Sequence, residues 1–447
     1  MRKNINLIIK KIPRLIGVIK APPSKSYTQR AIIIGSIHGR CKIVNPLYSN
    51  DTLATIHVCQ QLGAVIKRKS NCLYIVKGFY GLPRPKSYSI NVGESGTLLR
   101  FILPILALVK GNFKIQGQGT LLNRSNMTIV EALRSWNIQI SGIGKSHKVP
   151  IRLKGSGEIK GGRIYVSGIE SSQAISSLLI ASPFAKNNTT IIVKDRLVSS
   201  PYVDITIDVL QQAGIKVKNE HYKKFYVPCN QKIKPQKKFI IHGDYSSSAF
   251  LIVAACLLPS DITITDLIDD KQGDKKIVDI LNMMGAKIKC KKNTVRIKGP
   301  FVLKGMSIDC SSMPDLVPIL TVVGCFAKGK TKIYNISHLV HKESNRITTS
   351  AGELMKLGAN ISTTKDSITV KQSYLKPGCV CSCNDHRIAM ALLVAGLKIG
   401  NIRIESVNCI SKSYPDFLKN MKSIGAKFKD CQIALKVCPI IADVIRW

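Results

Sequence analysis

A glycine that ends an apolar helical stretch just before an alternating strand recurs along this chain, and it constrains the fold more than any other feature. The copies are Leu62-Gly63-Ala64, Ala213-Gly214-Ile215, Met284-Gly285-Ala286, Leu357-Gly358-Ala359 and Ile424-Gly425-Ala426, with Trp136-Asn137-Ile138 as a weaker copy. Glycine or asparagine at this position is typical of a left-handed helix C-cap. Successive markers are separated by 74, 77, 71, 73 and 67 residues. This spacing predicts six copies of one structural unit.

A second apolar helical stretch lies upstream of each marker and ends at a turn that leads into another strand. Gly39, Gly111, Gly329 and Gly400 lie in these turns. Each unit therefore contains helix, strand, helix and strand in that order, which predicts an α/β (α+β) fold in layers. The Lys-rich, Pro-containing stretch 228–238 follows the third unit, so we expect two lobes of three units each.

The repeat also argues against a nucleotide-binding loop. Residues 324–331, Gly-Cys-Phe-Ala-Lys-Gly-Lys-Thr, match the phosphate-binding loop pattern letter by letter. That pattern normally follows a strand and begins a helix. Here an apolar helical run, 316–327, comes first and an alternating strand, 331–336, follows it. The match is therefore interpreted as a turn of the repeat.

The charge of the 447-residue chain is far from balanced. Its 67 Lys and Arg residues against 26 Asp and Glu residues give a formal net charge of +41. A nucleic-acid-binding protein usually concentrates its cations in a patch and interleaves aromatic residues, whereas here the lysines are spread out and aromatic residues make up only 6%. We expect nucleic-acid binding to be non-specific if it occurs at all, and interpret most of the excess charge as compositional drift.

Three features predict a cytoplasmic protein. The apolar stretches 249–259 and 388–397 are shorter than the roughly 20 residues that span a bilayer, so no membrane span is expected. The leader 1–11 has an apolar core too short for a signal peptide, and no small-residue cleavage site follows it. Fourteen cysteines are scattered without a paired framework, which is typical of reduced thiols.

The first helix of each unit opens with small or charged residues. The openings are Ser24-Lys25-Ser26, Glu94-Ser95-Gly96-Thr97, Ser171-Ser172-Gln173, Ser246-Ser247-Ser248, Pro314-Asp315 and Asn384-Asp385-His386-Arg387. Free backbone N–H groups and the helix dipole favour anions there, although such residues also act simply as caps. The cations at or near these openings are Lys25, Arg30, Arg100, Arg124, Lys342, Arg346, Arg387 and Lys412. Their convergence on one cleft would require a multiply charged anionic substrate.

In order and spacing, these motifs resemble the EPSP synthase (enolpyruvylshikimate phosphate synthase) family over nearly the whole chain. The resemblance also includes Val198-Ser199-Ser200-Pro201-Tyr202, Gln272-Gly273-Asp274, Lys342-Glu343-Ser344 and Pro415-Asp416. It implies a two-lobed enolpyruvyl transferase fold with six repeated helix-strand units, three per lobe. Residues 22–241 would form the N-terminal lobe, and residues 242–447 together with the leader 1–21 the C-terminal lobe.

The resemblance implies a 3-phosphoshikimate 1-carboxyvinyltransferase. This enzyme transfers the enolpyruvyl group of phosphoenolpyruvate to the 5-hydroxyl of shikimate 3-phosphate and releases phosphate, on the route to chorismate and the aromatic amino acids. No metal or organic cofactor is expected, and the two small-molecule substrates are the expected partners of a monomer.

Site residues are carried over from the family motif by motif. Shikimate 3-phosphate would be held by Lys25, Ser26, Arg30, Ser171, Ser172, Gln173, Ser199, Tyr202, Asp315 and Lys342. Phosphoenolpyruvate would be held by Lys25, Gly96, Arg124, Gln173, Arg346, Arg387 and Lys412. Gly96 matters because the absence of a Cβ permits close approach of the backbone to a small ligand.

Two carboxyl groups are expected to move protons. Protonating the methylene carbon of phosphoenolpyruvate requires an acid that holds a proton near neutral pH and later takes it back, and Glu343 resembles that group. Asp315 matches the family's base for the attacking hydroxyl. The two roles could be exchanged, or shared with Lys25.

The chain departs from the family pattern at three positions. Glu94 and Asn345 stand where familiar members often have asparagine and aspartate, and Val340 stands where an arginine is common. A carboxylate at position 94 would repel a bound phosphate unless it points away or pairs with a cation. These departures concern fine positioning and turnover rather than the class of enzyme.

Other interpretations were weighed at particular residues. Cys379-x-Cys381-x-Cys383 places three thiols on one strand, a poor arrangement for a tetrahedral metal site. His386 is interpreted as a capping or supporting residue rather than a general base. A related transferase acting on a UDP-amino sugar would carry a reactive loop cysteine, which 116–124 lack. A nucleic-acid-binding protein built on the same repeat is the alternative from a different class.

Overall fold

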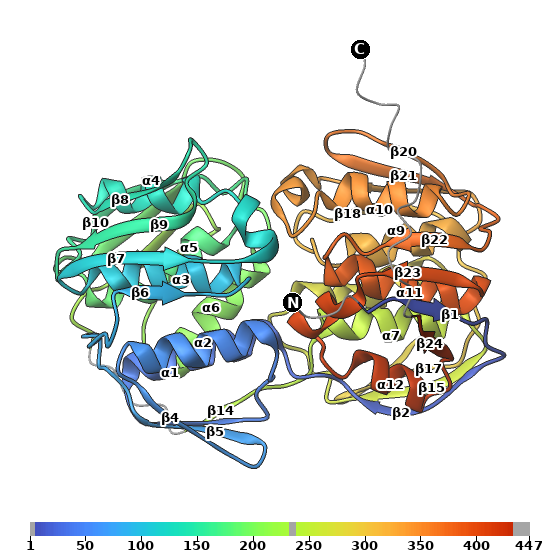
Figure 1. The fold of residues 1–447 in the computed structure, drawn as a ribbon, viewed down its shortest axis with the longest axis horizontal. Helices are drawn as coiled ribbons and strands as arrows, with labels where there is room; N and C mark the ends of the chain where they lie inside the picture. Colours follow the sequence, from blue (N-terminus) through green and yellow to red (C-terminus); the bar gives the residue numbers. More distant parts are fainter. Residues whose placement is uncertain (1–4, 232–237, 432–447) are drawn as a thin grey trace.

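The computed structural model describes residues 5–231 and 238–431. Figure 1 shows two lobes side by side, one coloured blue to green and the other mainly yellow to red. Over the described residues, the strands form six four-stranded sheets. The predicted α/β fold of six repeated units is therefore confirmed.

The second unit shows the pattern most simply. It runs through β6 (Ser89–Asn91), α3 (Gly96–Ala107), β7 (Gly111–Gln116), α4 (Met127–Ser135), β8 (Gln139–Ile143) and β9 (Lys148–Gly155). The sheet order is β6-β7-β9-β8, with β6 and β7 parallel and the other pairs antiparallel. The predicted order of helix, strand, helix and strand thus omitted a short leading strand and the last strand of the hairpin.

The other units repeat this arrangement with the following bounds. The third contains β10 (Gly162–Val166), α5 (Gln173–Ala181), β11 (Thr189–Val193), α6 (Pro201–Gln212), β12 (Lys218–Glu220) and β13 (Lys224–Val227). The fifth contains β18 (Ser307–Asp309), α9 (Val317–Phe326), β19 (Lys330–Tyr334), α10 (Arg346–Met355), β20 (Asn360–Thr363) and β21 (Ser367–Lys371).

Three units borrow strands from distant parts of the chain. The first unit borrows β14 (Lys238–Ile240). Its other elements are α1 (Lys25–His38), β3 (Cys41–Val44), α2 (Asn50–Gln61), β4 (Val65–Lys69) and β5 (Cys72–Lys77). The fourth unit borrows β2 (Leu15–Lys20). Its other elements are α7 (Tyr245–Leu257), β15 (Ser260–Thr265), α8 (Ile277–Met283), β16 (Lys289–Lys291) and β17 (Thr294–Ile297). The sixth unit borrows β1 (Leu7–Ile9). Its other elements are β22 (Gly378–Cys381), α11 (His386–Ile399), β23 (Ile402–Glu405), α12 (Phe417–Ser423) and β24 (Phe428–Asp430).

The chain crosses between the lobes twice, directly after β2 and directly after β14. The two crossings hydrogen bond to each other: the Ser24 amide donates to the His242 carbonyl at 2.8 Å, and the Asp244 amide donates to the Pro22 carbonyl at 2.7 Å. Because α1 and α7 begin at these crossings, the N-termini of both helices lie at the junction of the lobes.

The six marker residues end their helices in the same way. Gly63, Asn137, Gly214, Gly285, Gly358 and Gly425 all have φ between 61° and 110°. In each case the following amide bonds to the carbonyl five residues back, as in Ala359 N to Leu354 O at 3.1 Å, which satisfies a carbonyl that the helix leaves open. The turn at Gly329 lies between α9 and β19, so the interpretation of 324–331 as a repeat turn is confirmed.

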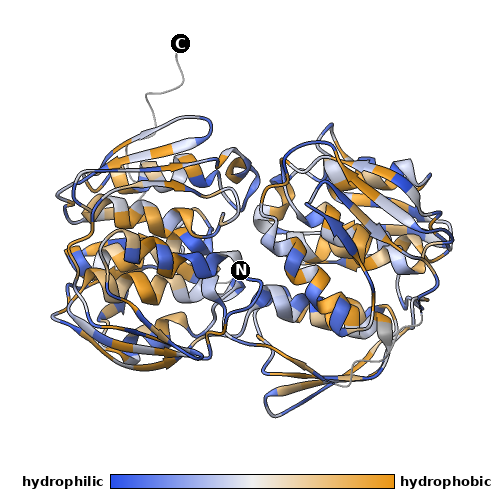
Figure 2. Cartoon of the chain, turned by 180° about the vertical axis from the view of Figure 1, so that it is seen from behind, coloured by the Kyte–Doolittle hydropathy of each residue, from blue (hydrophilic) through white to orange (hydrophobic). Residues whose placement is uncertain are grey.

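The first helices of the units form the interior of each lobe, and the sheets lie outside them (Figures 1 and 2). Every residue of α7 is buried, and in α3 only Thr97 is not. Helices that are apolar all round are typical of a buried position. No helix in the described ranges is both long and apolar enough to cross a membrane.

The helix-end glycines predict a pair of opposite stability effects within the fifth unit. Gly358 has φ +92°, and an added Cβ would meet nothing closer than the Tyr374 carbonyl oxygen at 3.6 Å, so Gly358→Ala should cost about 1–2 kcal/mol of unfolding free energy through backbone strain alone. Gly352 lies inside α10 with open space around it, so Gly352→Ala should stabilise by about 0.5–1 kcal/mol. Urea unfolding of both variants is the measurement, and shifts of the same sign would contradict the assignment.

Candidate active site

A polar cavity lies at the junction of the lobes, where the N-termini of the first helices meet. Its free volume is about 70 Å³, and Arg124 of one lobe lies 3.5 Å from Glu343 of the other. The lining residues come from both lobes: Lys25, Ser26, Arg30, Asp51, Gly96, Thr97, Arg124, Ser171, Ser172, Gln173, Ser199, Tyr202, Asp315, Lys342, Glu343, Arg346 and His386. The fold thus brings together nearly all the residues singled out in the sequence. Arg387 and Lys412 do not line the cavity but contact carboxylates that do.

Asp315 lies just before α9 and is held between two arginines. Its Oδ1 accepts a hydrogen bond from Arg346 Nη1 at 2.7 Å, and its Oδ2 accepts one from Arg387 Nη2 at 2.8 Å. Burial alone would raise the pKa of this carboxyl, but Arg387, Arg346 and Lys342 together hold the pKa well below its usual range. Asp315 is therefore a carboxylate in the substrate-free protein.

Glu343 is the second carboxylate of the cavity, and three cations surround it. Arg346 Nη2 lies 3.0 Å from its Oε2, while Arg124 Nη1 and Lys412 Nζ lie 3.5 and 3.8 Å from its Oε1. Burial would raise the pKa of Glu343, but Arg124, Lys412 and Arg346 lower it well below its usual range. In the substrate-free protein Glu343 therefore lacks the proton that a general acid needs.

Arg346 links the two carboxylates to a third that anchors the helix α11. Its side chain is 1% exposed, and its Nε donates to Asp385 Oδ2 at 2.8 Å. Asp385 is the N-cap of α11 and accepts from the Arg387 amide at 2.9 Å. One buried guanidinium therefore fixes Asp315, Glu343 and the start of α11 relative to one another.

The N-terminal lobe contributes buried arginines held largely by backbone carbonyls. Arg30 donates to the Ser26 and Tyr202 carbonyls at 3.0 and 2.9 Å, and Arg100 donates to the Gly96 and Ser125 carbonyls at 3.3 and 2.7 Å. Burial lowers the pKa of Arg30 to about 10 and that of Arg100 to about 9. Both remain cations at neutral pH, so this wall of the cavity carries positive charge.

Gly96 is the first residue of α3 and lies close to the guanidinium groups of Arg100 and Arg124. A Cβ built on Gly96 would lie 2.7 Å from Arg124 Nη1 and 2.9 Å from Arg100 Nη1. Because Arg100 is itself held by carbonyls and by Gln173, a side chain at position 96 would displace Arg124. The absence of a Cβ there therefore sets where the guanidinium of Arg124 can lie.

Several polar atoms at the cavity are buried without a hydrogen-bond partner. They are Arg124 Nε, Ser199 Oγ, Lys412 Nζ, and Nδ1 and Nε2 of His386. Buried polar groups in folded proteins are usually hydrogen bonded. Buried donors and acceptors without partners, in and next to one cavity, are what a site for a polar ligand requires.

His386 is the first residue of α11 and is 1% exposed. The cap of the helix is Asp385 rather than His386, so of the two roles expected for His386 the cap is wrong, and the supporting role stays a prediction. Burial, and then the neighbouring charges of Arg387 and Lys25, lower the pKa of the imidazole well below its usual range. His386 is therefore neutral.

The sequence did not single out Asp51, and it gave Thr97 only as part of the Glu94-Ser95-Gly96-Thr97 opening, without a role in the site. The Asp51 Oδ2 lies 3.1 Å from Lys25 Nζ, and the Thr97 hydroxyl accepts from Gln173 Nε2 at 2.9 Å. Asp51 occupies the first turn of α2, where an aspartate is ordinary, so only the packing of α1 against α2 distinguishes it from a helix-terminus residue.

Two of the departures from the family pattern have simple structural accounts. Asn345 is the N-cap of α10, and its side chain accepts from the Ile347 and Thr348 amides at 3.2 and 3.4 Å; asparagine and aspartate cap equally well. Val340 is 40% exposed and does not line the cavity.

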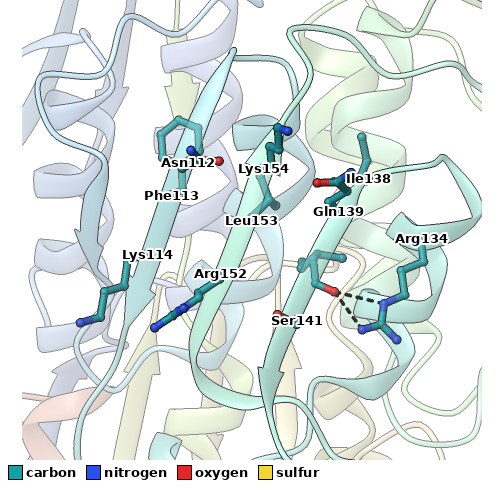
Figure 3. A pocket seen from close by; sticks show the side chains of 11 residues that line it. Asn112, Phe113, Lys114, Arg134, Ile138, Gln139, Ser141, Arg152, Leu153 and Lys154 are labelled. Atoms are coloured by element: carbon teal, nitrogen blue, oxygen red, sulfur yellow. Dashed lines mark hydrogen bonds between the residues drawn. The ribbon is translucent and has the colours of Figure 1, made fainter.

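Two other features lie away from this cavity. Figure 3 shows an open hollow of about 710 Å³ on the sheet β6-β7-β9-β8, lined in part by Lys114, Arg152 and Lys154. Arg134, which also lines it, donates to the Ile140 carbonyl. As for metals, the described part of the chain contains no group of three or more His, Cys, Asp or Glu residues that could hold an ion.

Comparison with known proteins gives a consistent result. The profile of the family described as EPSP synthase (3-phosphoshikimate 1-carboxyvinyltransferase) matches residues 9–421. A 3-phosphoshikimate 1-carboxyvinyltransferase of Methanocaldococcus jannaschii is 42% identical over 95% of this chain and 99% of its own length, and one of Methanosarcina mazei is 39% identical over 93% and 96%. An EPSP synthase structure from Acinetobacter baumannii superposes with a TM-score of 0.81 at 25% identity, covering 96% of this chain and all of that one.

The burial of His386 predicts an imidazole that does not titrate in the usual range. An unperturbed histidine has a pKa near 6.5, so at pH 6 an exposed imidazole is mostly protonated while that of His386 should stay neutral. The ring-nitrogen shifts of ¹⁵N-histidine-labelled protein would show this, with His386→Asn to assign the signal. A doubly protonated His386 at pH 6 would refute it.

Proposed function

The chain belongs to the EPSP synthase family, and we propose that the cavity between its lobes is where it works as a 3-phosphoshikimate 1-carboxyvinyltransferase (EC 2.5.1.19). The reaction of this enzyme of the shikimate pathway joins phosphoenolpyruvate to shikimate 3-phosphate, giving 5-enolpyruvylshikimate 3-phosphate and phosphate. One observation carries the placement: two carboxylates, Asp315 and Glu343, share the buried Arg346 among cations from both lobes. A site with that charge suits two anionic substrates and an internal proton donor and acceptor.

We propose two sets of substrate ligands among the residues in and next to the cavity. For shikimate 3-phosphate we propose Lys25, Ser26, Arg30, Ser171, Ser172, Gln173, Ser199, Tyr202, Asp315 and Lys342, and for phosphoenolpyruvate Lys25, Gly96, Arg124, Gln173, Arg346, Arg387 and Lys412. The donors without partners support this division, because Ser199 Oγ belongs to the first set and Arg124 Nε and Lys412 Nζ belong to the second.

Asp315 acts as the base in this proposal. It is ionised in the free protein and lies at the cavity wall next to Lys342. When the 5-hydroxyl attacks carbon 2 of phosphoenolpyruvate, its proton passes to Asp315. Lys25, paired with Asp51 at 3.1 Å, contributes charge to both substrates.

Glu343 acts as the general acid in this proposal, and it must first gain a proton when the substrate binds. Its low pKa in the free protein is due to Arg124, Lys412 and Arg346, the cations proposed to hold phosphoenolpyruvate. When the substrate's anionic groups pair with these cations, the attraction that keeps Glu343 ionised weakens and its pKa rises. Glu343 then protonates the methylene carbon, and takes a proton back from the resulting methyl group as phosphate leaves and the double bond re-forms.

The remaining features concern the protein as a whole. We propose that it acts as a monomer, because the proposed site is built from one chain. We also propose a reducing, cytoplasmic setting, since the cysteines among residues 5–231 and 238–431 are thiols, and nucleic-acid binding that is at most non-specific and weakened steeply by salt.

Assays of phosphate release test the activity and the three catalytic residues. Purified protein should release phosphate only when both phosphoenolpyruvate and shikimate 3-phosphate are present. Lys25→Met, Asp315→Ala and Glu343→Gln should each lower turnover roughly 100-fold or more while the fold is kept, since each removes a group that moves a proton or holds a charge in the reaction.

Matched controls are available on the surface of the N-terminal lobe. Lys145→Met and Glu131→Gln make the same charge changes at exposed positions and should retain wild-type turnover. Near-wild-type turnover in all three catalytic variants would refute the residue assignments, and absence of release from folded wild-type protein would refute the function.

A second prediction follows from the ionised state of Glu343. Binding phosphoenolpyruvate should raise the pKa of Glu343, because the cations around the carboxylate become neutralised, so binding should be accompanied by proton uptake at Glu343 that grows as the pH is lowered toward the raised pKa. Calorimetric titration in two buffers of different ionisation enthalpy measures that uptake. Glu343→Gln should bind without it, and equal heats in both buffers for the wild type would contradict the mechanism.

A further inference from the structure

Glu94 lies immediately before the N-cap of α3, on the side of the cavity where Lys412 enters from the other lobe. Its Oε2 accepts from the Thr120 amide and from the Thr120 hydroxyl, both at 3.3 Å. The turn that provides these donors begins at Gly119, where a Cβ would overlap the Glu94 carboxylate. The side chain is therefore held in place by residues of its own lobe.

The same carboxylate oxygen faces the ammonium group of Lys412. Lys412 Nζ lies 3.8 Å from Glu94 Oε2 and 3.8 Å from Glu343 Oε1. The lysine side chain is 6% exposed, and its Nζ has no hydrogen-bond partner. Lys412 is thus a buried cation balanced by two carboxylates at a distance, with its N–H groups still available to a ligand.

We propose that Glu94 is an internal counter-ion that competes with phosphoenolpyruvate for Lys412 and so weakens the binding of the substrate and of product phosphate. This inference rests on the proposed function, which assigns Lys412 to phosphoenolpyruvate. Glu343 must remain for the chemistry, whereas the polar contacts of Glu94 within residues 5–231 and 238–431 are with Lys412 and Thr120. Its negative charge therefore lowers the positive potential of the site without taking part in proton transfer.

The charge and the turn contact of Glu94 can be separated by one substitution. Glu94→Gln keeps an oxygen that accepts from Thr120 and removes the charge. Glu94 is 38% exposed, so the effect should be that of a partly screened ion pair, about a twofold to fivefold change.

The experiment compares steady-state kinetics of wild type and Glu94→Gln. We expect the KM for phosphoenolpyruvate and the inhibition constant of inorganic phosphate to fall about twofold to fivefold, with the KM for shikimate 3-phosphate unchanged. Because the effect is electrostatic, the difference between the two proteins should shrink as salt is added. An unchanged or raised KM for phosphoenolpyruvate would overturn the proposal.

Two controls distinguish this effect from other causes. Asn50→Ala removes a neighbouring contact between the lobes, Asn50 Nδ2 to Ser411 Oγ at 3.0 Å, without changing charge; an equal fall in KM there would assign the effect to lobe contact and overturn the proposal. Glu131→Gln, on the exposed face of α4, should leave the kinetics at wild-type values.

Lys412→Met distinguishes a failure of the inference about Glu94 from a failure of the assignment of Lys412 to phosphoenolpyruvate. If it raises the KM for phosphoenolpyruvate and Glu94→Gln does not lower it, the inference about Glu94 fails while the proposed site stands. If Lys412→Met leaves that KM unchanged, the assignment of Lys412 fails and the inference fails with it.

Discussion

The structure depends on how several buried guanidinium groups are paired and hydrogen bonded. Arg30, Arg346 and Arg387 are among the largest side chains that are fully buried, and a buried charge is costly unless it is paired and hydrogen bonded. Arg346 meets that condition by contacting Asp315, Glu343 and Asp385 at once. Each of these carboxylates begins or precedes a different helix, so neutralising one cation also fixes the positions of three helix N-termini.

The exchanged strands explain why the charges gather at the junction of the lobes. Because β2 and β14 each lie in the lobe opposite to the helix that follows them, α1 and α7 begin where the chain crosses over. The continuous units also begin their first helices at this cavity, as Gly96, Ser172 and Asp315 show, but the chain does not cross between the lobes there. The crossover ties the two first helices together, and a site built at their ends senses both lobes.

Much of the fold followed from the sequence because its signals are local. A glycine or asparagine with positive φ ends each repeat helix whatever surrounds it, and all six were visible as residue types. The leading strands were not visible, since β6 and β18 are three residues long and exist only through pairing with β7 and β19. The same limit applies to the site: serine, lysine and arginine at helix openings were recognisable, whereas the contact of Asp51 with Lys25 and that of Glu94 with Lys412 arise from packing between distant segments.

The net charge of +41 and the charge of the site are separate matters. The site uses a small set of buried cations, of which some face carboxylates in the substrate-free protein, as Arg124 and Lys412 face Glu343, and others are held by backbone carbonyls, as Arg30 is. Other cations are exposed, as on β16 (Lys289–Lys291), whose residues are all exposed. Exposed charges beyond about 8–10 Å are largely screened at physiological salt, so they add little to the potential that a substrate meets. What sets that potential is the balance between the buried cations and the carboxylates that face them, and in that balance Glu94, which faces the buried Lys412, counts for more than the exposed lysines of the sheets.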